Sequence, residues 1–238
     1  MDLNQKKVFI TGGSSGIGKA TAKLLAEAGA KVVITGRNKE KLEAVAKEIN
    51  CIPLQMEMTD YAAIPAKAKE ALELLGGLDI LINNAGHGAF TTLGNIKLED
   101  FESIFGANVF GLAMLTQEFL PLFTEQSSGD IINIASTASL KGFAHGTVYS
   151  ASKFAVRGMT QCWQAELRKH NVRVILVNPS EVTTAFANEE RTERAAEASK
   201  LRPIEIAHTI KATLEMDRRG FIPEVTVWAT NPQSGLGG

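Results

Sequence analysis

Tyr149, one of the two tyrosines in the chain, lies four residues before Lys153 in the segment VYSASK. A phenol has a pKa of about 10 and is a poor acid or base at neutral pH. A nearby ammonium favours the phenolate and lowers that pKa, which brings the phenol into the range useful for proton transfer. The spacing puts both side chains on one face of a helix. The pair predicts an acid–base site, although such a pair also arises by chance on a helix surface.

Ser136 ends the apolar run DIINIAS, thirteen residues before Tyr149. If this run is a strand, Ser136 stands at its carboxyl end, where its hydroxyl can share a substrate oxygen with the phenol. Ser136, Tyr149 and Lys153 are therefore candidate catalytic residues.

A glycine-rich segment, TGGSSGIG at residues 11–18, separates the first apolar run from the first helical pattern. Gly12, Gly16 and Gly18 allow a tight turn and a close approach of the backbone to a ligand. The helix that follows points its N–H groups and its dipole at a bound anion. A plain glycine-rich turn is the alternative, but the position favours pyrophosphate binding.

The second apolar run ends in VVITGRN, with Gly36 and then Arg37. Folds that prefer NAD usually place an acidic residue here to bind the ribose 2′-hydroxyl. A missing carboxylate and a guanidinium beside it favour NADP(H) over NAD(H). A solvated arginine in a surface turn remains the alternative.

Short β-branched runs alternate with longer helical patterns along the whole chain. This order predicts a doubly wound α/β (Rossmann) fold, with a parallel sheet of about seven strands and helices on both faces. We expect one domain over residues 1–238, with a flexible tail at 231–238. The expected strands are residues 7–11, 31–35, 51–56, 78–83, 130–136, 172–178 and 224–228. The expected helices are residues 17–28, 39–48, 62–75, 98–123, 148–170 and 203–216.

The charges nearly cancel, with 25 Lys and Arg against 26 Asp and Glu, so nothing steers the chain to nucleic acid or to an anionic membrane. No apolar run is long enough to cross a bilayer. Cys51 and Cys162 form no metal or redox spacing, which favours a reduced, cytoplasmic protein. The four histidines (His87, His145, His170 and His208) show no ligand spacing either, so we expect no metal site.

TGGSSGIG, NNAG at residues 83–86, Ser136 and YSASK resemble, in this order, the short-chain dehydrogenase/reductase family in its single-domain form. The resemblance extends from residue 7 to about residue 227. It implies that Tyr149 is the catalytic acid/base, that Lys153 regulates its pKa and binds the ribose, and that Ser136 polarises the substrate carbonyl. It also implies that Asn108, in GANVFG, holds a water in a proton relay; a mid-helix Asn bonded to its own backbone is the alternative.

The resemblance further implies a set of positions that bind the cofactor. They are Gly12, Ser14, Ser15, Gly16, Ile17, Gly18, Arg37, Glu57, Asn84, Ala85, Gly86, Tyr149, Lys153, Pro179, Val182 and Thr184.

Three positions depart from the family pattern. Ser180 replaces the usual glycine after the sixth strand, where it would tighten or polarise the floor of the active site. Glu57 stands where the family often has Asp beside the adenine. Ser15 stands where some NADP-dependent members carry a basic residue, which leaves the 2′-phosphate to Arg37, with Ser14 and Asn38.

The substrate is expected to be a small carbonyl compound or alcohol. Phe143, His145 and Phe186 are expected to line its pocket, and residues 185–200 are expected to form a lid. The helices at 98–123 and 148–170 carry extra apolar residues, which in this family pair across a homodimer or homotetramer; burial against the sheet is the alternative. These residues are Phe105, Phe110, Phe119, Phe154 and Trp163.

The leading hypothesis is an NADPH-dependent carbonyl reductase, either generic or acting on 3-oxoacyl-acyl-carrier-protein. A physiologically oxidising alcohol dehydrogenase is the second. A dinucleotide-binding protein without turnover is the third, but loss of Ser136, Tyr149 or Lys153 would mark such a protein, and all three residues are present.

Overall fold

The computed structural model describes residues 2–186 and 195–230, and the predicted tail lies outside these ranges. A seven-stranded sheet has the order β3-β2-β1-β4-β5-β6-β7, and every neighbouring pair is parallel. This confirms the predicted doubly wound fold. The strands are β1 (Lys7–Ile10), β2 (Lys31–Gly36), β3 (Ile52–Gln55), β4 (Ile80–Asn83), β5 (Gly129–Ile134), β6 (Val172–Pro179) and β7 (Glu224–Val227).

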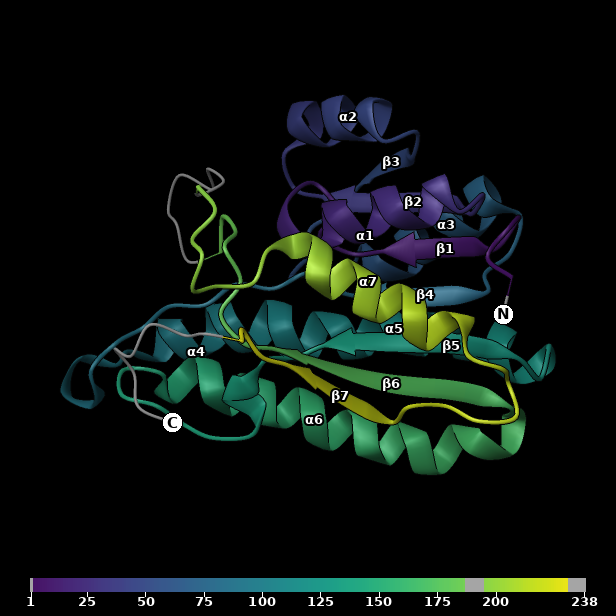
Figure 1. The fold of residues 1–238 in the computed structure, drawn as a ribbon. Coiled ribbons are helices and arrows are strands. Elements are labelled where there is room, and N and C mark those ends of the chain that lie inside the picture. Colours follow the sequence, from purple (N-terminus) through teal and green to yellow (C-terminus); the bar gives the residue numbers. More distant parts are fainter. Residues whose placement is uncertain (1, 187–194, 231–238) are drawn as a thin grey trace.

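Helices cover both faces of the sheet (Figure 1). On one face α1 packs beside α7, with α2 next to β2, while α3, α5 and α6 lie on the other face. The α-helices are α1 (Gly16–Glu27), α2 (Lys39–Glu48), α3 (Ile64–Leu75), α4 (Leu98–Phe105), α5 (Leu112–Glu125), α6 (Thr147–Leu167) and α7 (Pro203–Glu215).

The central strands are buried on both faces, which explains why their sequences are continuous apolar runs. Val8 and Ile10 point into the layer beneath α1, α2 and α7. Phe9 points to the opposite layer, where its ring meets Phe119 of α5 edge-on at 5.5 Å between centroids. Because successive side chains of a strand point to opposite faces of the sheet, β1 contributes residues to both hydrophobic cores.

The predicted helix over residues 98–123 is wrong in one respect, because a π-helical turn, Gly106–Gly111 (η2), separates α4 from α5. A Cβ at Gly111 would lie 2.2 Å from the carbonyl oxygen of Met58, so only glycine allows the helix to approach that segment. Asn108 lies in the middle of the turn. Such π-turns interrupt helices frequently at functional sites.

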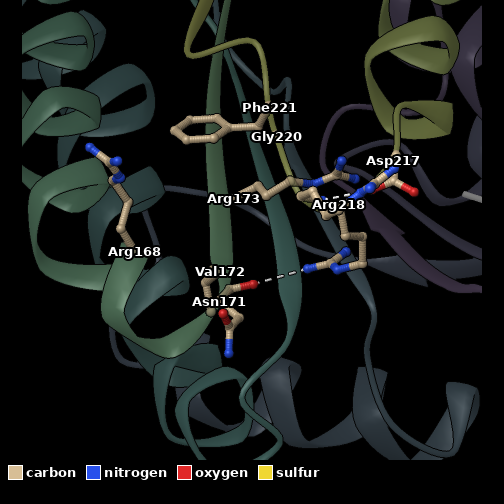
Figure 2. Close-up of a pocket in the computed structure, with 9 residues that line it drawn as sticks. Arg168, Asn171, Val172, Arg173, Asp217, Arg218, Gly220 and Phe221 are labelled. Carbon is tan, nitrogen blue, oxygen red and sulfur yellow. Dashed lines mark hydrogen bonds and ion pairs between the residues drawn. The ribbon is translucent and has the colours of Figure 1, made fainter.

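A charged network closes the amino-terminal edge of the sheet. The carboxylate of Asp130 in β5 is buried and pairs with Arg173 of β6 and, at 2.8 Å, with Arg218. Arg218 also donates to the backbone oxygen of Asn171 at 3.0 Å (Figure 2). These contacts tie β5, β6 and the connection after α7 together.

Within residues 2–186 and 195–230, no helix is both long and apolar enough to cross a membrane.

Candidate active site

The glycine-rich loop turns sharply between β1 and α1. Gly12 has a φ of 69°, and a Cβ there would lie 2.9 Å from the Cα of Ala85. A Cβ at Gly18 would lie 2.3 Å from the carbonyl oxygen of Gly12. A side chain at either position would block the turn, so the chain can turn here because both residues are glycine.

Helix α1 presents an open N-terminus to this loop. Ser15 precedes Gly16 in an extended conformation, no side chain in the described residues caps the first turn, and that turn carries no acidic residue. Uncapped N–H groups at a helix N-terminus bind anions such as phosphate. Ile17 packs against the core and anchors the turn. The loop therefore fits a dinucleotide pyrophosphate.

Asn84 joins the glycine-rich loop to the loop after β4. Its side-chain amide donates to the carbonyl oxygens of Thr11 at 2.9 Å and Gly12 at 3.0 Å. The Thr11 hydroxyl in turn accepts from the backbone N–H groups of Asn84 and Ala85. Asn84 thus holds the backbone of the glycine-rich loop in place, and Ala85 lies against Gly12. Thr11 was not among the site residues predicted from the sequence motifs.

The end of β2 carries the groups expected to choose between NADP and NAD. The Ser14 hydroxyl lies 3.0 Å from where a Cβ of Gly36 would stand, so Ser14 occupies the space that an acidic side chain there would need. Arg37 forms an ion pair with Glu57, with 3.7 Å between Nε and Oε2. Asn38 caps α2 by accepting from the Lys41 N–H at 2.8 Å, and its expected role at the 2′-phosphate stays a prediction.

Ser136, Tyr149 and Lys153 come together at the carboxyl ends of β5 and its neighbours. Tyr149 and Lys153 lie one turn apart on α6 and are both buried. Ser136 forms a hydrogen bond with the phenol. The Lys153 ammonium lies 5.8 Å from the centre of the Tyr149 ring and donates to the Ile134 carbonyl oxygen at 3.0 Å.

Asn108 is bonded to a distant segment and not to its own helix. Its amide donates to the His87 carbonyl oxygen at 2.9 Å and to the Ser152 hydroxyl at 3.2 Å, while its oxygen accepts from the His87 N–H. Ser152 in turn donates to the Tyr149 carbonyl oxygen at 2.7 Å. A Cβ on Gly86 would lie 2.8 Å from the Asn108 oxygen. The π-helical turn thereby links the loop after β4 to α6.

The short chain dehydrogenase family model matches residues 6–195. The chain belongs to this family. The predicted resemblance is confirmed, and the protein is an oxidoreductase of the short-chain dehydrogenase class. An uncharacterized oxidoreductase of Staphylococcus aureus is 38% identical over 229 residues, which are 94% of this chain and 97% of that protein.

Two solved short-chain dehydrogenases extend the comparison. A metagenomic short-chain oxidoreductase in complex with NADP is 32% identical, with a TM-score of 0.83 over 99% of this chain and 100% of that one. The 3-ketoacyl-(acyl-carrier-protein) reductase of Brucella melitensis, complexed with NADH, is 29% identical, with a TM-score of 0.87 over 96% and 98%.

Burial shifts the pKa values of Tyr149 and Lys153, the candidate acid–base pair. It raises the pKa of Tyr149 to about 12, and the hydrogen bond with Ser136 lowers that pKa by less. Burial also lowers the pKa of Lys153 to about 8. The predicted net lowering of the phenol pKa is therefore wrong for this structure, because burial raises the pKa of Tyr149 more than the Ser136 hydrogen bond lowers it.

The segment after β6 forms one wall of the dehydrogenase site. Pro179 ends β6, Val182 pairs with Leu201 in an isolated bridge, and the Thr184 methyl lies 3.1 Å from where a Cβ of Gly16 would stand. Thr184 thus lies against the glycine-rich loop, and its predicted contact with the cofactor phosphate stays a prediction.

Ser180, at the position of the family's usual glycine, is bonded to β7 and to the segment that follows it. Its hydroxyl accepts from the Ala229 N–H at 3.2 Å, and its own N–H donates to the Val227 carbonyl oxygen. The side chain secures the segment after β7, and its predicted effect on the floor of the active site stays a prediction.

A pocket of about 920 Å³ lies at the opposite edge of the sheet, between the end of α6 and the connection after α7 (Figure 2). Arg168, Asp217 and Phe221 contribute to its walls. Ser136, Tyr149 and Lys153 do not line this pocket. Within residues 2–186 and 195–230, no group of His, Cys, Asp and Glu could hold a metal ion.

The predicted lid lies partly outside the described residues. Residues 187–194 are not described, while Ala185 is buried and Phe186 contacts the Tyr149 ring.

Proposed function

We propose that this dehydrogenase is an NADPH-dependent carbonyl reductase, which converts a ketone to a secondary alcohol with Tyr149 as the proton donor. The observation that carries the proposal is the buried Tyr149 hydroxyl, bonded to Ser136 and backed by Lys153. With a pKa of about 12 the phenol holds its proton at neutral pH, as an acid for reduction must.

The residues at the carboxyl edge of the sheet fit a nicotinamide dinucleotide. The uncapped first turn of α1 would hold the pyrophosphate, and Thr184 would close over it. Lys153 would bind the ribose beside the nicotinamide. When bound, the cofactor supplies the hydride that the carbonyl carbon accepts.

The protein's own groups manage the proton and the charge. Ser136 and Tyr149 would both donate to the carbonyl oxygen and polarise it toward an alkoxide. Tyr149 then gives up its proton to that oxygen. The Lys153 ammonium stabilises the phenolate that remains, because opposite charges in a buried site interact strongly. Asn108 keeps the backbone around Tyr149 in place through Ser152 and His87.

The proposal is tested by following NADPH oxidation by the purified protein with small ketones, diketones and an acetoacetyl thioester, with NADH in parallel. We expect turnover with NADPH and a carbonyl substrate. No turnover with any pair, in a protein that demonstrably binds NADPH, would contradict the proposal.

A 3-oxoacyl-acyl-carrier-protein reductase is the second candidate. It is supported by the similarity to the Brucella melitensis enzyme named for that reaction. A preference for the acetoacetyl thioester in the same assay would favour it. Net alcohol oxidation with NADP+ at physiological ratios would instead favour an oxidising alcohol dehydrogenase.

Arg37 is the residue we expect to select NADPH. Its guanidinium is exposed, and the ion pair with Glu57 holds it at the end of β2 beside Ser14. Guanidinium groups bind phosphates through paired hydrogen bonds. Glu57 competes for the same guanidinium, so the selection for the 2′-phosphate is smaller than with an unpaired arginine.

Replacing Arg37 by alanine should raise the KM for NADPH about 10- to 100-fold, because a hydrogen bond to a charged group is lost. The KM for NADH should hardly change. Lys39→Ala removes a positive charge two residues away and is the matched control. Equal losses for both cofactors, measured by steady-state kinetics, would contradict the role of Arg37.

We also propose that the dehydrogenase forms a homodimer or homotetramer through the surface of α4, the π-helical turn and α6. Phe110 and Phe154 are 51% and 44% exposed on these adjacent elements, with Met114 beside them at 41%. Exposed apolar side chains gathered on adjacent elements mark interaction sites. Phe119 is fully buried against the sheet and does not belong to this surface.

A glutamate in place of Phe154 should convert the oligomer to a monomer, because the interface would bury an unpaired charge. Size-exclusion chromatography with light scattering measures the mass. Met216→Glu, at an apolar residue of similar exposure after α7, should leave the mass unchanged. A wild-type protein that is monomeric at micromolar concentration would contradict the interface.

We place the enzyme in the cytoplasm. Cys51 and Cys162 are both unpaired in the described structure, as expected of a protein kept in a reducing compartment.

A further inference from the structure

We propose that Phe90, Phe143 and Phe186 form an aromatic wall beside Tyr149 that selects ketones with an aryl group next to the carbonyl. This inference rests on the proposed carbonyl reductase and names its substrate class.

The four rings form a continuous chain of contacts. Phe143 meets Phe90 at 5.8 Å between centroids, and Phe90 meets Tyr149 edge-on at 5.7 Å and 80°. Phe186 contacts the Tyr149 ring at 5.4 Å. Tilted and edge-to-face pairs at these distances are the favourable aromatic geometries. The ring that carries the catalytic hydroxyl is therefore part of the wall.

Two of the rings are exposed although they adjoin a buried one. Phe90 is 47% and Phe143 42% exposed, against 8% for Tyr149. Leaving two aromatic rings in water next to the proton donor costs hydrophobic free energy that a ligand can recover by covering them. Their position next to the phenol points to the substrate as that ligand.

Glycines beneath the rings make room for them. A Cβ at Gly88 would lie 3.0 Å from the Phe186 ring and 3.1 Å from that of Tyr149. A Cβ at Gly146 would lie 2.6 Å from the Phe143 ring. Any larger residue at these two sites would push the rings away from the phenol.

Hydrogen bonds link the two backbone segments that carry the exposed rings of Phe90 and Phe143. The Thr91 N–H donates to the His145 carbonyl oxygen at 2.9 Å, which ties the segment after β4 to the segment before α6. His145 is in the left-handed conformation, with a φ of 66°, and its Nδ1 lies 3.4 Å from the Thr92 hydroxyl. Phe90 and Phe143 are thus presented by linked segments.

A flat aryl group fits this wall better than an aliphatic group of equal size. Aromatic pairs contribute beyond the area that they bury, and a saturated ring cannot stack or meet an edge in the same way. A ketone whose oxygen reaches Tyr149 and Ser136 would place an adjoining aryl ring against Phe90. A short acyl thioester gains no aromatic contact there.

The test compares 1-phenylethanone with cyclohexyl methyl ketone, which has the same carbon skeleton without the aromatic ring, and with an acetoacetyl thioester. We expect wild-type protein to prefer the aryl ketone by kcat/KM. Phe90→Ala and Phe90→Leu should each lower the ratio of aryl to cyclohexyl activity about three- to tenfold, the range of one aromatic pair. Leu93→Ala removes a more exposed apolar side chain from the same connection and should leave the ratio unchanged.

Binding is measured separately in the Tyr149→Phe protein, which keeps the ring but lacks the hydroxyl. Saturation transfer in NMR from protein to the aryl protons should be strong and should weaken when Phe90→Ala is added. Transfer without turnover of any ketone in the wild type would overturn the proposed reductase and support the aryl-binding wall. Turnover with no aryl preference, or a ratio unaffected at Phe90, would overturn the wall and leave the reductase standing.

Discussion

The Tyr149→Phe protein is expected to lose carbonyl reduction almost completely, with kcat lower by about two to four orders of magnitude, the usual contribution of a positioned general acid. Phenylalanine keeps the ring contacts with Phe90 and Phe186, so the substitution removes the hydroxyl alone. Single-turnover and steady-state kinetics with saturating NADPH measure the loss.

Tyr61→Phe is the matched control, because it deletes the hydroxyl of the only other tyrosine, which is 42% exposed and lies outside the proposed site. Its activity should equal that of the wild type. NADPH affinity and melting temperature of the Tyr149→Phe protein should stay close to wild-type values. If kcat in that protein fell by less than a few fold, another group would have to supply the proton.

The second large effect concerns stability and lies at the opposite edge of the sheet. Asp130→Asn should lower the free energy of unfolding by about 3–5 kcal/mol, the cost of breaking a buried ion pair and leaving a charge without its partner. Arg173 is buried and would keep its bonds to the Leu214 and Met216 carbonyl oxygens, but no carboxylate would offset its charge. Arg218 would lose the same partner.

Urea denaturation of the full chain measures this change, with the m-value as a check on two-state behaviour. Arg219→Ala removes an exposed arginine from the neighbouring Asp217 pair and should shift stability by less than about 0.5 kcal/mol. An Asp130→Asn protein as stable as the wild type would mean that solvent reaches Arg173 and screens it.

The groups proposed for catalysis and the Asp130 ion-pair network lie at opposite edges of the sheet. The carboxyl edge of the sheet carries the groups proposed for chemistry, including Tyr149 and the glycine-rich loop. The amino edge carries the Asp130 cluster, which joins β5 and β6 at the base of the strand that leads to Ser136. Substitutions at the two edges should therefore separate catalysis from stability.

The order of strands and helices was predictable because the hydrophobic pattern of each element lies within its own short stretch of sequence. A β-branched run such as residues 172–178 is buried on both faces, and helices begin and end within a few residues of the expected positions. The pattern could not show the π-helical turn at Gly106–Gly111. Gly111 of that turn lies against the Met58 carbonyl oxygen, which is far away in the sequence.

The sequence by itself determined the doubly wound fold, the glycine-rich cradle and the Tyr149–Lys153 spacing, because these depend on residues close together in the chain. Only the tertiary structure decided which distant residues form hydrogen bonds with one another and which side chains are buried. Thr11 and Asn84 lock two loops, Asn38 caps a helix, and Ser180 turns to Ala229. The pKa of Tyr149 rises to about 12 because residues from separate segments exclude water from the phenol, and no local pattern reports that exclusion.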